Sequence, residues 1–431
     1  MCFKLILICV LLSTFNTVFS SIETELNSDE CNANLVETIP IGLTYNSSIT
    51  TKDTFKEMIA LISSATTTLD IASFYWSLLG TDVMPHPDNS SIKGKEILDT
   101  IVTTTRRRDL ITRIVVNQTT TNNTDLQLLA SVANIRQLNF TRLIGAGVLH
   151  TKFIIVDQKH VYIGSANMDW RSLTHVKEMG VVLYNCSVLA NDLIKIFQVY
   201  WYLGTTNATI PKSWPQDWST NYNKSNPLSL SINEKPYNVF MSSSPKSFCP
   251  NGRTNDISAI LSIIRNANKY IYIAVMDYYP QYLYSNYRAF WPLIDNELRK
   301  AVIDRKVNVR LLASHWNNTR KSMPLFLKSL AAFNDSSVFG AHIECKLFVV
   351  PAFTPQQADI PFARVNHNKY MVTDQTAYIG TSNWSADYFV NTAGVGIAIT
   401  PTNSSHYSIR DQLQEIFERD WNSSYANIYK F

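Results

Sequence analysis

Glycine and charged residues are both scarce in this chain, and each shortage excludes a class of protein. Thirteen glycines among 431 residues are too few for a collagen-like repeat or for glycine-rich linkers. Charged residues make up 17% of the chain, below the roughly 25% of an average soluble domain, whereas apolar residues make up 45%. This balance excludes wholesale disorder and predicts a substantial core. At about 150 residues per domain, the length suggests two or three domains.

An excess of one sign of charge is also lacking, and long apolar runs are confined to the N-terminus. Lys plus Arg is 38 and Asp plus Glu is 34, so the net charge of +4 is too small to imply a polyanionic partner by itself. Residues 1–20 have the form of a secretory signal, with Lys4 before an apolar core that is shorter than the ~20 residues of a membrane-spanning helix. We predict a cleaved signal peptide, with an uncleaved N-terminal anchor as the alternative. The remaining chain is expected to be soluble and either secreted or in the endolysosomal lumen.

Cysteine is limited to six residues, of which Cys2 and Cys9 lie in the predicted signal. The other four are an even number for an oxidising compartment, which favours one or two structural disulfides, and no spacing suggests zinc. Thirteen Asn-x-Ser/Thr sequons exceed the roughly seven expected by chance and support export. Asn383 belongs to a motif described below, so we expect glycosylation at the other sequons: Asn46, Asn89, Asn117, Asn122, Asn139, Asn185, Asn207, Asn223, Asn317, Asn334, Asn403 and Asn422.

An internal repeat is the most informative feature of the sequence. Four blocks recur in the same order at offsets near 200, and strand-like runs alternate with amphipathic helical runs, which predicts an α/β fold with a largely buried sheet in each half. Four prolines among polar residues mark 205–237 as a linker between halves at 31–204 and 238–431. Two similar halves suggest a pseudo-two-fold axis with a site where they meet. Helices are predicted at residues 52–64, 126–134, 189–201, 256–266, 293–305 and 410–420.

One repeated block carries the chemistry. The pattern His-x-Lys-x4-Asp begins at His150 and again at His367, and each copy is followed by Gly-Ser/Thr-x-Asn. In a strand, residues i and i+2 share a face, so the histidine and the lysine of each copy point the same way. Across a pseudo-two-fold axis, this arrangement gathers two imidazoles and two ammonium groups around one pocket, which suits a phosphodiester.

These side chains are sufficient for phosphodiester cleavage. One histidine can attack phosphorus to form a covalent phosphohistidine, and the other can protonate the leaving oxygen. The lysines and the asparagines can hold the non-bridging oxygens as charge develops. We expect no metal or other cofactor, because the lysines supply positive charge and the sequence offers no close carboxylate clusters of the kind found at two-metal sites.

The doubled motif resembles the phospholipase D superfamily. Residues 71–76, 149–153, 164–172, 365–373 and 378–385 resemble more closely its lumenal branch, which includes animal phospholipase D-like 5′-exonucleases. The resemblance covers about residues 30–425. It implies two duplicated α/β/α sandwich domains, the phospholipase D fold, with the active site at their pseudo-two-fold interface.

The resemblance also implies roles for individual residues. Glu178 matches a family carboxylate that orients an imidazole, and its counterpart in the second half is placed at Thr392, so the two histidines are not equivalent; we predict His150 as the nucleophile and His367 as the acid. Asp157 and Asp374 belong to the motif but are expected to act structurally or indirectly, because they lie beyond the strand end. The family pattern pairs Cys31 with Cys186, and Cys249 with Cys345 is a weaker second pairing. The implied catalytic motif is His150, Lys152, Asp157, His367, Lys369 and Asp374, with Asn167, Asn383, Ser165 and Ser382 binding substrate.

The predicted function is a metal-independent phosphodiesterase of the phospholipase D type. The first interpretation is hydrolysis of glycerophospholipids such as phosphatidylcholine to phosphatidic acid and headgroup, with possible peripheral membrane contact. The alternative is a lumenal exonuclease that trims single-stranded DNA or RNA from its 5′ end by the same chemistry. A homodimer is compatible with either. A non-catalytic secreted binding protein would predict a broken motif, but both copies are intact. Six aromatic residues beside the motif strands are expected mainly in the core, with base stacking or an acyl groove as the alternative: Tyr75, Trp76, Trp170, Tyr278, Tyr279 and Trp384.

Overall fold

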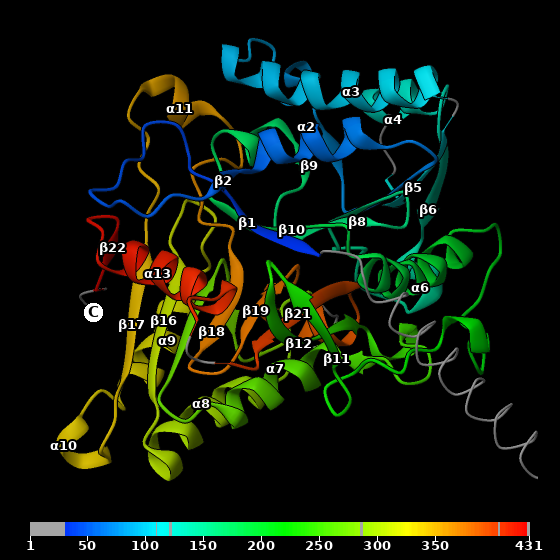
Figure 1. Cartoon of the computed structure of the whole chain (residues 1–431). Coiled ribbons are helices and arrows are strands. Elements are labelled where there is room, and N and C mark those ends of the chain that lie inside the picture. The colour runs from blue at the N-terminus through cyan, green and yellow to red at the C-terminus, as the bar shows by residue number, and fades with distance from the viewer. Residues whose placement is uncertain (1–30, 109, 120–122, 285–287, 404–405, 429–431) are drawn as a thin grey trace, which may run out of the picture.

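Two mixed β-sheets form the framework of the protein, and each carries helices on both faces (Figure 1). The computed structural model describes residues 31–108, 110–119, 123–284, 288–403 and 406–428. The predicted signal peptide and the sequon at Asn122 lie outside the described residues. Among the described residues, no helix combines the length and apolar character needed to cross a bilayer.

The two sheets have matching strand orders, which confirms the internal repeat at the level of topology. The first sheet runs β2-β1-β10-β8-β7-β3-β5-β6, and the second contains the equivalent series β13-β12-β21-β19-β18-β14-β16-β17, with β11 and β22 added at its edges. The strands of the first sheet are β1 (Asn32–Thr38), β2 (Lys52–Asp53), β3 (Thr68–Ser73), β5 (Ile111–Asn117), β6 (Asn134–Leu138), β7 (Phe153–Val156), β8 (His160–Gly164) and β10 (Glu178–Tyr184). Those of the second are β11 (Leu228–Ile232), β12 (Lys235–Ser244), β13 (Thr254–Asn255), β14 (Tyr270–Val275), β16 (Asn308–Ser314), β17 (Ile343–Phe348), β18 (Lys369–Thr373), β19 (Ala377–Gly380), β21 (Gly394–Pro401) and β22 (Ala426–Asn427).

The helices follow the same duplication. Asp53 caps α2 by accepting from the Lys56 N–H at 3.0 Å, and Ser408 and Asp411 form a capping box at the start of α13. Two short strand pairs, β4 (Trp76–Ser77) with β9 (Met168–Asp169) and β15 (Tyr278–Tyr279) with β20 (Trp384–Ser385), lie outside the main sheets. The α-helices are α2 (Thr54–Ser64), α3 (Ile92–Arg108), α4 (Thr124–Leu129), α5 (Phe140–Leu143) and α6 (Ser187–Leu203) in the first half, and α7 (Asp256–Asn266), α8 (Leu293–Arg305), α9 (Ser322–Ala331), α10 (Ser336–Phe339), α11 (Pro355–Asp359), α12 (Ala386–Val390) and α13 (Ile409–Trp421) in the second.

The largest core lies between the sheets and is shared by both halves. Helices α6 and α13 lie between the two sheets in Figure 1, and each contributes buried side chains, such as Phe197 and Phe417, to this core. Separate outer cores lie under α2 and α3 on one side and under α7 and α8 on the other. The two sheets therefore share one apolar interior, which fixes the halves relative to each other.

Three sequence expectations differ from the structure. The helix expected at 126–134 ends at Leu129, and Asn134 already begins β6. The predicted helices omit α3 apart from its threonine-rich C-terminal end, because the β-branched run 103–105 has low helix propensity. The segment 205–237 contains β11 and the start of β12, so the second sheet begins before the expected boundary at 238.

Candidate active site

The two histidine motifs meet at the junction of the halves. His150 and Lys152 directly precede β7, and His367 and Lys369 occupy the same place at β18. Each histidine backbone is held by the opposite half: the His150 N–H donates to the Ala393 carbonyl at 2.9 Å, and the His367 N–H donates to the Lys177 carbonyl at 2.8 Å. The expected pseudo-two-fold arrangement is therefore present in the backbone hydrogen bonds.

Both imidazoles are fixed through Nδ1 by groups from the opposite half. His150 Nδ1 lies 2.8 Å from the Thr381 carbonyl oxygen, which can only accept, so this nitrogen carries the proton. His367 Nδ1 lies 2.8 Å from Glu178 Oε2. In both rings Nε2 remains as the nitrogen available to a cavity of about 420 Å³ that both histidines line. The site can therefore present two ring nitrogens to a single phosphorus centre.

The motif lysines are buried behind the histidines. Lys152 and Lys369 are 2% and 1% exposed, and each Nζ donates to the carbonyl oxygen of its own histidine at 2.6 Å. Burial lowers the pKa of Lys369 to about 7 and holds the pKa of Lys152 well below its ordinary value, with the charge of Lys369 adding to the effect. A bound phosphate anion offsets both the desolvation of the two ammonium groups and the repulsion between them. The site therefore favours a ligand that brings negative charge.

Burial also shifts the pKa values of the two histidines and of Glu178 in the direction that disfavours the charged form. Burial, followed by the nearby lysines, holds the pKa values of His150 and His367 well below their ordinary range. Burial also raises the pKa of Glu178 to about 7, against the opposing influence of Lys369. Glu178 and His367 are hydrogen-bonded to each other, and burial disfavours the charged form of each group. They therefore form a coupled pair that can hold one proton between them.

Asparagines of the two Gly-Ser/Thr-x-Asn segments also line the cavity. Asn167 Nδ2 lies 3.4 Å from the Tyr75 hydroxyl, and Asn383 Nδ2 lies 3.3 Å from Asp277 Oδ2. Within the described part of the chain, neither Oδ1 atom accepts a hydrogen bond although both are buried. The amides are thus placed beside the histidines with hydrogen-bonding capacity to spare.

The two serines expected to bind substrate do not line this cavity. The Ser165 hydroxyl is used by β10: it accepts from the Met179 N–H at 2.9 Å and donates to the Met179 carbonyl at 3.2 Å. Ser382 is fully buried and packs beside Gly394. The expectation for Ser165 and Ser382 is corrected: both support the segments that carry the asparagines.

The counterpart of Glu178 is also corrected. Glu178 begins β10 and Gly394 begins β21 at the equivalent place, because Lys177 and Ala393 make the same backbone contacts to the two histidines. The equivalent residue is thus Gly394 rather than Thr392. A Cβ at Gly394 would lie 2.1 Å from Ser382 Oγ, so no carboxylate fits there and the asymmetry is built into the packing.

The motif aspartates lie away from the cavity, at the turns between a helix and the motif-facing strand. Asp157 accepts hydrogen bonds from the N–H groups of Thr66, Thr67 and Thr68, and Asp374 accepts from those of Asn268 and Lys269. These bonds outweigh partial burial and lower the pKa of Asp157 to about 2. The aspartates are therefore structural, as the beyond-the-strand argument expected.

Replacing Asp157 with alanine should test this structural role. The variant loses hydrogen bonds to three backbone N–H groups, so we expect the free energy of unfolding to fall by about 1–2 kcal/mol, with partial exposure limiting the loss. Because the native pKa is lowered, this contribution is present above pH 4 and is lost as the pH falls towards 2. Urea unfolding measures the change; a wild-type midpoint together with a large loss of kcat would contradict it.

Aromatic residues of the cavity were largely missed by sequence reasoning. Phe74 and Tyr388 contact the His150 ring with centroids 5.1 and 4.8 Å away, and Trp316 and Phe362 form the outer wall. Phe74 and Trp316 follow the carboxyl ends of β3 and β16, which was the one available signal. Phe362 lies in the loop before β18 and Tyr388 lies in α12, and no sequence pattern marked either of them. Tyr75 lines the cavity, whereas the other candidate stacking residues are buried in the core or inner packing: Trp76, Trp170, Tyr278, Tyr279 and Trp384.

Cysteines and sequons have clear positions in the structure. Cys31 and Cys186 form a disulfide with an S–S distance of 1.90 Å. Cys249 and Cys345 are free thiols, which corrects their suggested pairing: Cys249 hydrogen-bonds Ser243, whereas Cys345 lies in β17 against the outer core. No group of three or more potential metal-ligating side chains occurs among the described residues. Asn383 is buried, and seven of the other sequon asparagines are exposed: Asn46, Asn89, Asn207, Asn317, Asn334, Asn403 and Asn422.

Known proteins are similar to this chain over most of its length. The family model described as "PLD3/4, PLD-like domain" matches residues 47–353. The chain is 49% identical to the 5′-3′ exonuclease PLD3 of Xenopus laevis, over 94% of this chain and 83% of that protein. It is 44% identical to the 5′-3′ exonuclease PLD4 of Mus musculus, over 94% and 81%. Among solved structures, a phosphatidylserine synthase of Haemophilus influenzae has the same fold, with a TM-score of 0.56, 13% identity and coverage of 87% and 85%.

Proposed function

The chain belongs to the family of PLD3/4, PLD-like domains, and from this premise we propose that it is a 5′-3′ exonuclease of single-stranded nucleic acid. It is a phosphodiesterase of the phospholipase D superfamily. The relatives at 44–49% identity are named exonucleases, which favours the alternative substrate of the sequence analysis over a glycerophospholipid. The lipid-processing neighbour shares the fold alone at 13% identity.

The aromatic wall of the cavity is the observation that carries this proposal. Five rings line it, from Phe74, Tyr75, Trp316, Phe362 and Tyr388, whereas its aliphatic lining is limited to Val176, Met276 and Val365. Phe362 is 66% exposed and lies edge-to-face with Trp316, with ring centroids 6.5 Å apart. Exposed rings beside a phosphate site stack on bases without regard to sequence, whereas two acyl chains need a long aliphatic groove.

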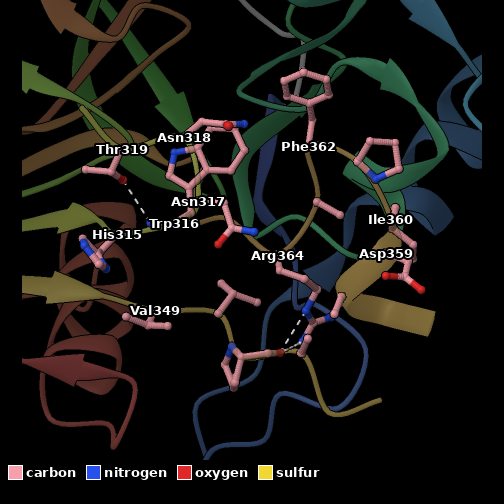
Figure 2. A pocket seen from close by; sticks show the side chains of 16 residues that line it. His315, Trp316, Asn317, Asn318, Thr319, Val349, Asp359, Ile360, Phe362 and Arg364 are labelled. Atoms are coloured by element: carbon pink, nitrogen blue, oxygen red, sulfur yellow. Dashed lines mark hydrogen bonds between the residues drawn. The ribbon is translucent and has the colours of Figure 1, made fainter. Parts of the chain in front are cut away.

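A second cavity continues from this wall. It encloses about 790 Å³ and shares Trp316 and Phe362 with the catalytic cavity (Figure 2). Asn318 and Thr319 line it, and these side chains offer donors and acceptors to base edges and sugars. Asn317 also lines it, so the proposed path of the strand excludes the glycosylation expected at this sequon. In our proposal, the strand passes from this cavity across the two rings, which brings its terminal phosphodiester to the histidines.

The reaction proceeds in two steps in this proposal. His150 Nε2 attacks phosphorus, the bond to the leaving oxygen breaks, and the proton held by His367 and Glu178 passes to that oxygen. A water molecule then attacks phosphorus, loses its proton to His367 and releases His150. The assignment rests on the contrast between the two rings. Burial and the nearby lysines keep His150 neutral and the Thr381 carbonyl holds its proton on Nδ1, which leaves Nε2 free to attack, whereas the Glu178 carboxyl group stabilises a proton on His367.

Activity is expected to be highest below about pH 7. As the pH falls through 7, the Glu178–His367 pair takes up its proton and Lys369 gains its charge, since the pKa values of Glu178 and Lys369 are both about 7. At lower pH the rate falls again when His150, whose pKa is held low by burial, becomes protonated. Above pH 7 we expect kcat/KM to drop about tenfold per pH unit. A pH–rate profile from 4 to 10 measures this, and a rate still rising above pH 9 contradicts it.

A direct substrate comparison tests the proposed function. Purified protein in EDTA is offered 5′-hydroxyl single-stranded DNA and, separately, phosphatidylcholine vesicles. We expect stepwise release of nucleotides from the 5′ end and no phosphatidic acid. Trp316→Ala should lower kcat/KM on DNA about 10- to 100-fold, the value of one lost base stack, and change the hydrolysis of bis(p-nitrophenyl) phosphate less than about threefold.

Tyr407→Ala provides the matched control, because Tyr407 is 50% exposed and does not line either cavity. It should leave both substrates unaffected. Phosphatidic acid formation without nucleotide release contradicts the proposal, as does a requirement for added Mg²⁺ or Zn²⁺.

We further propose that the protein works in the lumen of the secretory or endolysosomal system. The Cys31–Cys186 disulfide and the exposed sequons support an oxidising, glycosylating route. An acidic lumen also suits the expected pH optimum.

A further inference from the structure

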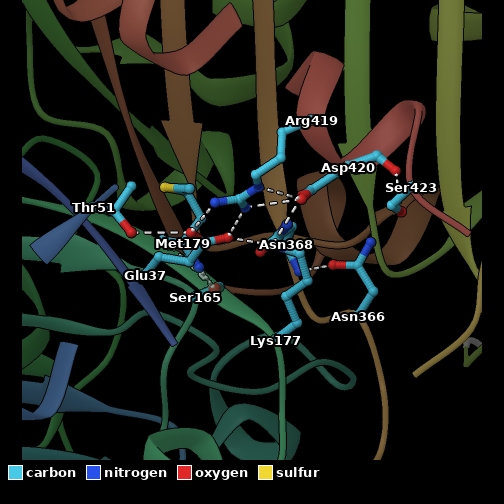
Figure 3. Close-up of polar contacts among 10 residues, drawn as sticks. All are labelled: Glu37, Thr51, Ser165, Lys177, Met179, Asn366, Asn368, Arg419, Asp420 and Ser423. Carbon is cyan, nitrogen blue, oxygen red and sulfur yellow. Dashed lines mark hydrogen bonds and ion pairs between the residues drawn. The ribbon is translucent and has the colours of Figure 1, made fainter. Parts of the chain in front are cut away.

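Four buried ionic side chains form a cluster at the junction of the halves (Figure 3). They are Glu37 of β1, Lys177 immediately before β10, and Arg419 and Asp420 of α13, and none is more than 2% exposed at its side chain. Lys177 pairs with Glu37, and its Nζ lies 2.9 Å from Asp420 Oδ2. Arg419 donates to Glu37 Oε2 at 3.0 Å and to Asp420 Oδ1 at 2.8 Å. The charges balance, yet the proposed reaction uses none of them.

The cluster is connected to His367 through the backbone of Lys177. The Lys177 N–H donates to the Val365 carbonyl at 2.9 Å, and the Lys177 carbonyl accepts from the His367 N–H at 2.8 Å. The next residue, Glu178, holds the His367 ring at Nδ1. Fixing the Lys177 side chain therefore fixes both the backbone and the ring orientation of His367.

The internal repeat shows which part of this arrangement the fold requires. Ala393 holds the backbone of His150 in the same way that Lys177 holds that of His367, with a hydrogen bond of 2.9 Å. Ala393 has no charged group, and Gly394 stands in the place of Glu178. The backbone junction thus forms without an ionic side chain at this position.

The other members of the cluster have no charged counterparts either. Glu37 lies opposite Met179 in β10, and its equivalent opposite Val395 in β21 is Ser243. Aligning Trp421 with Trp201 places Val199 and Tyr200 at the positions of Arg419 and Asp420. The four positions of the cluster therefore carry neutral side chains in the other half, where a separate buried ion pair, Arg253 with Asp192, lies near Tyr200.

A buried ionic cluster is weak evidence for stability. Taking four charges out of water is costly, and apolar replacements of similar volume are often as stable. The ion pairs instead fix the orientation of each side chain, because each charged group has to lie within reach of its partners. The cluster also lies on the side of the histidine that is hydrogen-bonded to the Glu178 carboxyl group, which is the histidine proposed to act as the acid.

We propose that Lys177, held by Glu37, Arg419 and Asp420, is a positioning residue for His367 and Glu178. It keeps the proton of this pair directed at the leaving oxygen, and it does not contribute to attack by His150. The inference rests on the proposed phosphohistidine mechanism. Loss of Lys177 should therefore slow a reaction more when its leaving group needs a proton than when it does not.

Lys177→Met tests this with two leaving groups. In single-stranded DNA the leaving group is a sugar oxygen of the remaining strand, which needs a proton as the bond to phosphorus breaks. In bis(p-nitrophenyl) phosphate the leaving group is p-nitrophenolate, which leaves without a proton. We expect turnover of DNA to fall about 100-fold, within the range of general-acid contributions. The first burst of p-nitrophenolate should slow less than about threefold, and the phosphoryl adduct should persist because water activation also needs His367.

Two further variants separate positioning from folding. Lys177→Met with Glu37→Gln removes one charge of each sign, so it serves if the single variant does not fold by circular dichroism. Arg253→Met is the matched control: it removes a cation from an equally buried pair, with Arg253 Nη1 2.6 Å from Asp192 Oδ2. It should lower the melting temperature without changing the ratio of the two rates.

The outcomes are distinct. An unchanged ratio in both Lys177 variants, or the same altered ratio in Arg253→Met, overturns the positioning role while leaving the phosphohistidine mechanism intact. A His367→Ala protein that forms no adduct with bis(p-nitrophenyl) phosphate overturns the proposed mechanism, and this inference with it.

Discussion

His150→Ala is expected to lose turnover of single-stranded DNA by about 10⁴-fold or more, the scale seen when a catalytic nucleophile is removed. The reason is that His150 Nε2 faces the cavity as a neutral lone pair, since the Thr381 carbonyl holds the proton on Nδ1, whereas His367 carries the acid proton in the proposed mechanism. No covalent adduct should form with any substrate, including one with a p-nitrophenol leaving group. The melting temperature serves as the control for correct folding, because His150 also packs against Phe74 and Tyr388.

His367→Ala should give a different defect. Turnover of DNA is expected to fall about 10²- to 10⁴-fold, because the leaving oxygen loses its acid. With bis(p-nitrophenyl) phosphate, His150 should still be phosphorylated, since p-nitrophenolate leaves without a proton. Breakdown of the adduct needs His367 as a base, so the adduct should accumulate. Quenched-flow measurement of p-nitrophenolate should show one equivalent released per enzyme and little thereafter; steady release at the wild-type rate contradicts the role.

The sequence predicted the outline of this site, and the family resemblance predicted its asymmetry at Glu178 but placed the counterpart at Thr392 instead of Gly394. The doubled motif and the i, i+2 rule were enough to bring His150, Lys152, His367 and Lys369 together, and duplication implied the matching strand orders. Such reasoning treats the two copies as equal. The difference between them comes from packing across the junction, where Gly394 leaves no space for a carboxylate and Glu178 therefore serves His367.

The residues that the sequence could not place are those fixed by tertiary contacts alone. Trp316 lies just beyond β16 and reaches the cavity only because the two halves meet there. Ser165 looked like a ligand because it belongs to the motif tail, but the backbone of Met179 occupies its hydroxyl. Helix α3 was hidden by a threonine-rich run, and its stability comes from packing on the outer core through Ile97 and Ile101.

The account depends on a covalent intermediate at one named atom, and locating that intermediate is the most direct test. His367→Ala is mixed with bis(p-nitrophenyl) phosphate at pH 6, and intact mass followed by peptide mapping finds the modified residue. One p-nitrophenolate leaves when His150 attacks and the second ester stays on phosphorus, so we predict a single p-nitrophenyl phosphoryl adduct on the peptide that contains His150, and none when His150→Ala is combined with the first substitution. An adduct on His150→Ala that maps to His367 would reverse the roles of the two histidines, and the absence of any adduct would contradict the phosphohistidine mechanism itself.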